Sequence, residues 1–355
     1  MLGSWIAILL LLLAPTYRVA AATNCVPITS RNLDDLEPYI TIHQGDFVDL
    51  SWSPDSTKLA VSGNGGILLV SAQSQEINQA ITFAVEQVGD NEYLPTAPSL
   101  AFSPDGALLA FSLWNLSGFD LLTAESRILL DYDEEEIGAV EEIAFNNDGK
   151  IAALITDDGS LLLLDVERGI LTARVDPEVD YLSGQAVIFS SDDSVIIDAV
   201  WNTITFRDSL SLDEFSTSAP TDAVVRDIAL TPNGRVLAGV SNNYGYGGQA
   251  YLTLWDMNTF EQLTTIETNS GSVSVSFNPN GDIMAIGGAE EIYLWEIPTS
   301  DISEIADHES HRLEGHIGEV QSVAFSPDGR FLASASVDFL LQSEDGNVII
   351  WGVCS

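Results

Sequence analysis

The stretch from Gly315 to Trp351 decides the fold, because it contains one complete copy of a unit that the chain repeats. It begins Gly315-His316, continues through the apolar positions Val320, Val323 and Phe325 to the turn Ser326-Pro327-Asp328-Gly329, and ends Asp345-Gly346-Asn347-Val348-Ile349-Ile350-Trp351. Proline fixes φ and glycine accepts positive φ, so the Pro-Asp-Gly turn makes a hairpin of the two runs beside it. Asp345-Gly346 predicts a second turn. One such set of antiparallel strands cannot bury its own apolar faces and needs neighbouring copies.

The chain supplies seven copies. Aligning the residue before each turn places them 41 to 50 residues apart, at Trp52, Phe102, Phe145, Phe189, Leu230, Phe277 and Phe325. A period of this length predicts an all-β, seven-bladed β-propeller with four strands per blade.

The unit resembles the WD-repeat family, on its Gly-His opening, its Ser-Pro-Asp-Gly turn and an aspartate six residues before a strand-ending tryptophan. The resemblance implies that the N-terminal strand pairs with the C-terminal blade and closes the ring. It also implies a structural hydrogen-bonded set in the last blade, made of His316, Ser336, Asp345 and Trp351. Other copies depart from the pattern, and the second and fourth are the least typical.

The N-terminus has the features of a secretory signal over residues 1–22, with an apolar core from Trp5 to Ala14 and the small residues Ala20-Ala21-Ala22. We therefore expect a lead-in segment at 23–37 and one propeller domain at 38–355. The protein is therefore expected to be secreted, either extracellular or periplasmic, and not to insert into a membrane after the signal is cleaved. A lipid anchor on Cys25 is the alternative fate of that residue.

The chain has two cysteines, Cys25 near the expected mature N-terminus and Cys354 near the C-terminus. Export would supply the oxidising compartment in which a disulfide persists. In an antiparallel pair, the end of the strand that finishes at Trp351 lies beside the start of the strand near Tyr39. We therefore predict a Cys25–Cys354 disulfide; two free thiols are the alternative.

The charge of the chain limits its partners. With 53 Asp and Glu against 12 Lys and Arg, the formal net charge is −41. Nucleic acids and anionic membranes are poor partners, because phosphate binding requires Lys and Arg. A protein or peptide partner, preferably basic, and a monomeric ring are expected.

Acidic and tyrosine residues gather in the loops that, in the family's topology, share one face of the disc. Tyrosine beside charge suits a recognition surface, because it buries a large area at low entropic cost. A solvated acidic loop set is the alternative interpretation. The candidate binding residues are Asp90, Glu92, Tyr93, Asp131, Asp133, Glu134, Glu135, Glu136, Asp180, Tyr181, Tyr244 and Tyr246.

Signs of chemistry are weak. His308 and His311 have a metal-ligand spacing but lie in a polar connector, so no metal and no cofactor are predicted, and no nucleophile motif occurs. The first strands, expected to line the central channel, are apolar at Val48, Leu50, Ile143, Val187, Ile188, Val273 and Val275. This favours a non-catalytic scaffold that binds a protein or peptide. The alternative is an enzyme that acts on a glycan or small organic substrate with carboxylates in the channel.

Overall fold

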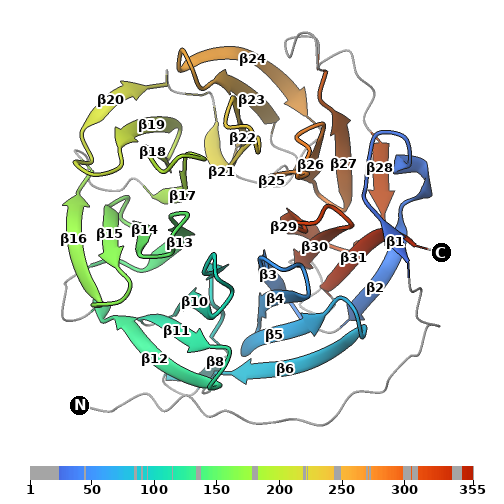
Figure 1. Ribbon diagram of the computed structural model, residues 1–355, viewed down its shortest axis with the longest axis horizontal. Coiled ribbons are helices and arrows are strands. Elements are labelled where there is room, and N and C mark those ends of the chain that lie inside the picture. Colours follow the sequence, from blue (N-terminus) through green and yellow to red (C-terminus); the bar gives the residue numbers. More distant parts are fainter. Residues whose placement is uncertain are drawn as a thin grey trace.

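The computed structural model forms a ring of seven β-sheets around a central channel (Figure 1). It describes residues 24–43, 45–83, 86–88, 91–93, 95–113, 115–132, 137–177, 183–218, 221, 223–243, 249–268, 271, 273–298, 305, 311–337 and 346–354. No helix within these residues is long and apolar enough to cross a membrane.

Six blades are four-stranded antiparallel sheets in chain order, and the innermost strand of each faces the channel. The first three blades are β3 (Phe47–Trp52), β4 (Lys58–Gly63), β5 (Gly66–Ser71) and β6 (Glu76–Thr82); β9 (Leu100–Phe102), β10 (Leu108–Ser112), β11 (Leu116–Asp120) and β12 (Glu125–Leu130); β13 (Val140–Phe145), β14 (Ile151–Thr156), β15 (Leu161–Asp165) and β16 (Ile170–Val175). The next three are β17 (Gly184–Phe189), β18 (Val195–Val200), β19 (Thr203–Asp208) and β20 (Glu214–Thr217); β21 (Val224–Leu230), β22 (Val236–Asn242), β23 (Ala250–Asp256) and β24 (Glu261–Thr268); β25 (Ser274–Phe277), β26 (Ile283–Gly287), β27 (Glu291–Glu296) and β28 (His311–Glu314). A small hairpin of β7 (Glu86–Val88) and β8 (Asn91–Tyr93) lies between blades one and two.

Blade seven joins the two ends of the chain. It contains β29 (Glu319–Phe325), β30 (Phe331–Val337) and β31 (Asn347–Cys354), and its outer edge is completed by β2 (Glu37–His43) and β1 (Cys25–Val26). β2 pairs with residues 347–352 of β31, and β1 pairs with residues 353–354 of the same strand. The predicted ring closure by the N-terminal strand is thus confirmed.

The predicted disulfide between Cys25 and Cys354 is also confirmed. The two residues are direct cross-strand partners, which brings their Cα atoms to 4.0 Å. Between β1 and β2 the chain makes one short 3₁₀ helix, η1 (Leu33–Asp35).

The predicted turns lock the first hairpins of blades one, two and seven in the same way. In blade seven, Ser326 Oγ donates to Asp328 Oδ1 at 2.7 Å and accepts the N–H of Phe331 at 3.0 Å, while Gly329 has φ of 71°. Ser53 with Asp55, and Ser103 with Asp105, repeat the hydroxyl–carboxylate bond. These local bonds fix the register of the strands that follow.

The core consists of seven apolar clusters, each between two adjacent blades. The cluster between blades six and seven contains Phe325 and Trp351, which are 8% and 2% exposed. The residues expected at the centre of the last repeat are therefore packed, and each blade is stabilised mainly by its neighbours.

Candidate functional site: the central channel and the loop face

Because neighbouring strands are antiparallel, the connections between them alternate between the two faces of the disc. We call the loop face the side that carries the loops leading into each blade and the loops between its second and third strands. The opposite side, the turn face, carries the Ser-Pro-Asp-Gly turns and the turns between third and fourth strands.

One position on each innermost strand faces its neighbours around the channel. It lies three residues before the aligned aromatic or leucine residue of every repeat. Its occupants, from blade one to blade seven, are Asp49, Ser99, Glu142, Ala186, Asp227, Ser274 and Ser322.

Several of these side chains connect adjacent blades by accepting a backbone N–H from the next innermost strand. The donor and acceptor pairs are Leu100 N to Asp49 Oδ2 at 2.8 Å, Ile143 N to Ser99 Oγ at 3.2 Å, Val275 N to Asp227 Oδ2 at 2.8 Å, and Val323 N to Ser274 Oγ at 3.1 Å. Ser322 links blade seven to blade one by donating to Asp49 Oδ1 at 3.2 Å. Asp49 and Asp227 therefore have a structural role. Glu142 makes no such bond within the described residues.

The residue just before this position is a β-bulge in five of the seven blades, where the register with the second strand shifts by one. A bulge leaves one residue unpaired and redirects its side chain. All five bulge residues line a cavity of about 730 Å³ at the loop-face end of the channel: Val48, Glu141, Gln185, Arg226 and Gln321.

This cavity is acidic. Its lining includes Asp49, Glu142 and Asp227 from the ring, together with Glu141 and Glu319. Arg226 is the one basic residue among the described residues of the lining, and it is held by Asn242, whose Oδ1 accepts from its Nε at 2.7 Å.

Burial in the channel changes the protonation of the ring carboxyls. It raises the pKa of Asp49 to about 7, against the backbone N–H donors of Leu100 and Leu50, which lower it. It raises the pKa of Asp227 to about 6. Burial first, and then the charges of Asp49 and Asp227, raise the pKa of Glu142 well above its usual value. Asp49 and Asp227 therefore take up protons between about pH 6 and 7, and Glu142 does so at a higher pH than an exposed glutamate.

The expectation of an apolar channel holds only in part. Val48, Leu50 and Val273 line the cavity, but most of its described lining residues are polar. Ile143, Val187 and Val275 are instead buried in the clusters between blades. Sequence alternation failed because the bulges break it. The aligned repeats did indicate a polar channel, because the two positions that precede the buried apolar residue of each innermost strand are mostly polar.

Most of the predicted binding residues lie outside the described part of the chain, namely Asp90, Asp133, Glu134, Glu135, Glu136, Asp180, Tyr181, Tyr244 and Tyr246. Glu92 and Tyr93 belong to β8, in the hairpin that leads into blade two, and Asp131 follows β12 in the loop that leads into blade three. These three positions are in loop-face connections. The grouping of the full set on this face stays a prediction, because the other nine residues lie outside the described part of the chain.

The hydrogen-bonded set of the last blade differs from the expected one. Trp351 Nε1 donates to Ser334 Oγ at 2.8 Å, and Ser334 Oγ lies 2.6 Å from His316 Nε2. Ser334 replaces Ser336 in this role because it is two residues from Leu332, the cross-strand partner of Trp351, whereas Ser336 is four residues away. Burial lowers the pKa of His316 to about 4, so the imidazole is neutral at physiological pH.

Asn347 fills the position expected for Asp345, which lies outside the described residues. Its Oδ1 is 2.5 Å from His316 Nδ1 and accepts from Ser336 Oγ at 2.8 Å. A neutral imidazole that donates through Nδ1 and accepts through Nε2 satisfies the chain of bonds from Trp351 to Asn347. Ser336 thus belongs to the set through Asn347.

Metal-ligand chemistry has little support in the described residues, which contain no group of three His, Cys, Asp or Glu placed to hold an ion. His311 is 3.3 Å from Asp34 Oδ1 through Nε2, and His308 lies outside the described part.

Residues 308–352 match the family described as WD domain, G-beta repeat. The chain is 24% identical over 218 residues to the serine-threonine kinase receptor-associated protein of Gallus gallus, which covers 60% of this chain and 54% of that protein. It is 31% identical over 109 residues to WD repeat-containing protein 18 of Rattus norvegicus, covering 30% of this chain and 22% of that protein. The matches thus span about half or less of these relatives.

Solved structures share the fold. A chain in the crystal structure of a mitotic checkpoint complex superposes with a TM-score of 0.71 at 17% identity, over 100% of both chains. A chain of hydrazine synthase from Kuenenia stuttgartiensis superposes with a TM-score of 0.69 at 16% identity, over 88% of this chain and 97% of that chain. These likenesses show the fold alone. The chain thus carries a match to the WD repeat at residues 308–352, is similar over part of its length to a WD repeat-containing protein, and forms a closed seven-bladed β-propeller.

Proposed function

We propose that this protein is a non-catalytic scaffold that binds a basic protein or peptide through its loop face, outside the cytoplasm. WD-repeat propellers are typically protein-interaction scaffolds. The observation that carries the proposal is the cavity at the mouth of the channel, which opens among the loop-face connections and has five carboxyl side chains against one guanidinium among its described lining residues.

Charge complementarity favours a basic partner. The predicted loop residues would extend the negative potential of the cavity outward, and the chain as a whole has a formal charge of −41. Such a field accelerates the approach of a basic partner and excludes polyanions such as nucleic acids and anionic membranes.

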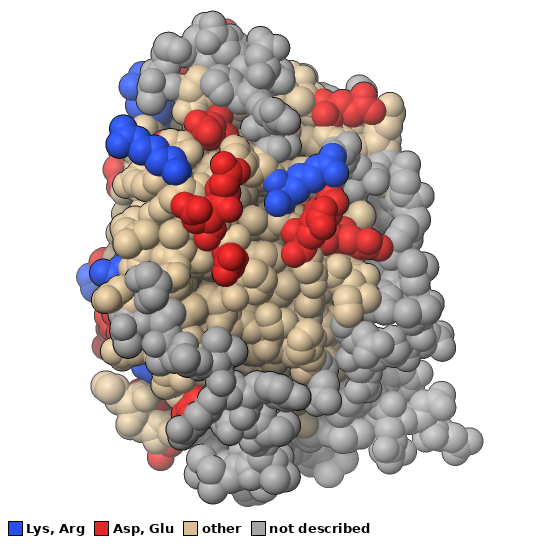
Figure 2. Space-filling model, turned by 90° about the vertical axis from the view of Figure 1, so that its right-hand side faces the viewer, with Lys and Arg blue, Asp and Glu red and all other residues tan. Residues whose placement is uncertain are grey.

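The rim of the disc is a weaker candidate. Figure 2 shows the side formed by the outer strands of blades six and seven, where acidic side chains lie beside basic ones. One such pair on this rim joins Arg312 Nη1 to a Glu291 carboxylate oxygen at 3.4 Å. Mixed charge of this kind gives little net attraction for a basic partner.

The proposed location and the monomeric state have separate support. The Cys25–Cys354 disulfide is of a kind that persists in oxidising compartments, and residues 1–22 have the pattern of a secretory signal. A ring that closes on itself needs no second copy to complete a blade.

The test is the salt dependence of binding to matched peptides. Lysine-rich, arginine-rich and glutamate-rich peptides of one length are measured by fluorescence anisotropy at low and physiological salt. We expect the basic peptides to bind and to lose affinity steeply as salt rises. The triple variant Glu134→Gln, Glu135→Gln and Glu136→Gln should slow association more than it speeds release.

The matched control removes three acids from the turn face, by Asp120→Asn, Asp208→Asn and Asp256→Asn, which keep their turn-capping oxygens. This variant should bind as the original protein does. Equal losses in the two triple variants would mean that only net charge matters, and affinity indifferent to salt would refute the proposed face. Cross-linking in the native extracellular fraction then identifies the natural partner.

The second candidate function is that of an enzyme with its active site in the channel, and one observation favours it. Glu142 lines the cavity, burial raises its pKa well above the usual value, and it makes no inter-blade bond in the described residues, which makes it the candidate proton donor. Hydrolysis of a glycosidic or ester probe that is lost in Glu142→Gln and retained in Asp120→Asn would establish it.

A further inference from the structure

The seam of the ring is closed twice along one edge of β31. β2 pairs with residues 347–352 through a ladder from Glu37↔Gly352 to His43↔Asn347. β1 adds only two pairs, Cys25↔Cys354 and Val26↔Val353. The ring is therefore already closed by β2, and the disulfide acts on the segment that precedes β2.

We call this segment, residues 24–36, the strap. Figure 1 shows the N-terminal strands β1 and β2 at the outer edge of the last blade, beside β28. Ile28, Leu33 and Leu36 of the strap are 1%, 3% and 8% exposed and belong to the apolar cluster between blades six and seven. The strap thus covers an apolar part of that interface.

Its other attachments are few. Ile28 N donates to Gly329 O at 2.8 Å, in the turn of blade seven. Asp34 pairs with His311 at 3.3 Å, but the Asp34 side chain is 91% exposed, so this contact contributes little.

The balance of magnitudes makes the covalent bond decisive. Ordering the backbone of a thirteen-residue segment costs more free energy than the burial of three apolar side chains returns. A tether at Cys25 offsets part of that cost, because the strap is then fixed at both ends. Without it, packing and the bond from Ile28 N to Gly329 O oppose release.

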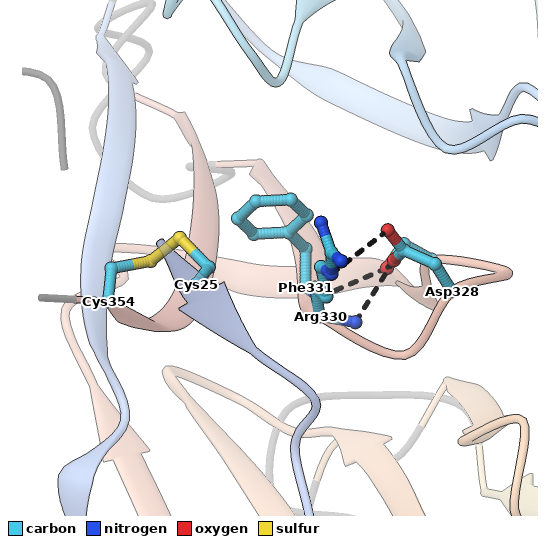
Figure 3. The surroundings of a disulfide bond; sticks show 6 residues. Cys25, Asp328, Arg330, Phe331 and Cys354 are labelled. Atoms are coloured by element: carbon cyan, nitrogen blue, oxygen red, sulfur yellow. Dashed lines mark hydrogen bonds and ion pairs between the residues drawn. A yellow bond between two sulfur atoms is a disulfide. The ribbon is translucent and has the colours of Figure 1, made fainter. Parts of the chain in front are cut away.

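The disulfide is open to attack. Cys25 and Cys354 are both partly exposed, and Val26 beside them is 47% exposed. Figure 3 shows the two sulfur atoms near the hairpin of Asp328, Arg330 and Phe331, at the edge of the blade.

We propose that the Cys25–Cys354 disulfide is a redox latch, whose reduction releases the strap from the gap between blades six and seven while β2 keeps the ring closed. A dithiol reductant attacks one sulfur as its thiolate and forms a mixed disulfide with it. Its second thiol then displaces that cysteine. The protein gains two thiols, and the reductant becomes a disulfide. The released strap exposes apolar surface of blades six and seven.

Hydrogen exchange measured by mass spectrometry on the full mature chain tests the latch, with dithiothreitol as the reductant. Peptides covering 24–36 should exchange about tenfold faster or more after reduction, while peptides covering β2 and β31 residues 347–352 keep their protection. The variant Cys25→Ser/Cys354→Ser should show the fast exchange without reductant and no further change with it.

Three results would overturn the proposal. If the strap keeps its protection after complete reduction, packing alone holds it. If β2 and β31 lose protection together with the strap, the disulfide holds the ring and is no latch. Faster exchange when dithiothreitol is added to the double variant would show that the effect does not come from this bond, and would equally refute it.

Discussion

Arg207 and Asp198 occupy in blade four the two positions that Trp351 and Ser334 occupy in blade seven. Asp198 lies nine residues after Phe189, as Ser334 does after Phe325, and Arg207 pairs across the sheet with Ile196 as Trp351 pairs with Leu332. Arg207 Nε donates to Asp198 Oδ1 at 2.8 Å, with side chains 14% and 2% exposed. An ion pair thus replaces the tryptophan–serine bond.

Breaking this ion pair should be costly. Asp198→Ser leaves the Arg207 guanidinium buried without its counter-ion, and we expect the free energy of unfolding to fall by about 3 to 5 kcal/mol. The double variant Asp198→Ser/Arg207→Trp copies the pair of blade seven and should lose less than Asp198→Ser alone. Urea unfolding of the three proteins measures both values. A double variant less stable than either single variant would show that the two positions are not equivalent.

Trp295 in blade six and Trp351 in blade seven occupy equivalent positions, and they should respond differently to the same substitution. Trp351 Nε1 bonds Ser334, whereas the buried Trp295 Nε1 has no partner in the described residues, because Ile286 stands where blade seven has Ser334. Trp351→Phe therefore loses a bond and leaves the buried Ser334 Oγ without the donor that it has in the original protein. We expect it to cost about 1 to 3 kcal/mol more than Trp295→Phe.

Thermal or urea unfolding of the two Trp→Phe variants measures this difference in stability. Each variant is the control for the other, because both lose the same side-chain volume. Introducing an acceptor by Ile286→Ser should make Trp295→Phe more costly than it is in the original protein. Equal costs for the two Trp→Phe changes would contradict the bonding assigned to Ser334.

Much of the fold could be predicted because its signals are local. The turn after Phe325 depends on four consecutive residues, so the spacing of seven such turns gave the number of blades. The Cys25–Cys354 pair followed from topology, because a closing strand must run antiparallel beside the last one. Both conclusions rest on turn chemistry and strand topology, and neither requires the packing of the other side chains to be known.

The channel and the last hydrogen-bonded set were harder, because each depends on register. A bulge at Glu141 or Arg226 moves one side chain into the channel without changing the apolar pattern around it. The choice between Ser334 and Ser336 likewise depends on which residue faces Trp351 across the sheet. Sequence periodicity fixes the face of a strand but not its register with the next one.

The stability of the ring should increase as the pH falls from 8 to 5, through the channel carboxyls. The folded-state pKa of Asp49 is about 7 and that of Asp227 about 6, both above the usual 3.8. The folded protein therefore binds more protons than the unfolded chain between these values. Their stabilising contribution is complete below about pH 4 and is lost as the pH rises through 6 to 7.

Comparison with Asp49→Ser/Asp227→Ser isolates this effect, since serine is the residue that blades two, six and seven use at the same position and keeps one acceptor for the inter-blade N–H. One pKa unit corresponds to about 1.4 kcal/mol, so the original protein should lose on the order of 2 to 4 kcal/mol relative to this variant between pH 5 and pH 8. His316 has a lowered pKa and changes stability in the opposite direction, but equally in both proteins. Urea unfolding at several pH values measures the difference, and Glu261→Gln, on an exposed outer strand, controls for the loss of charge. Parallel pH profiles for the original protein and the double variant would show that the two channel carboxyls do not titrate in this range.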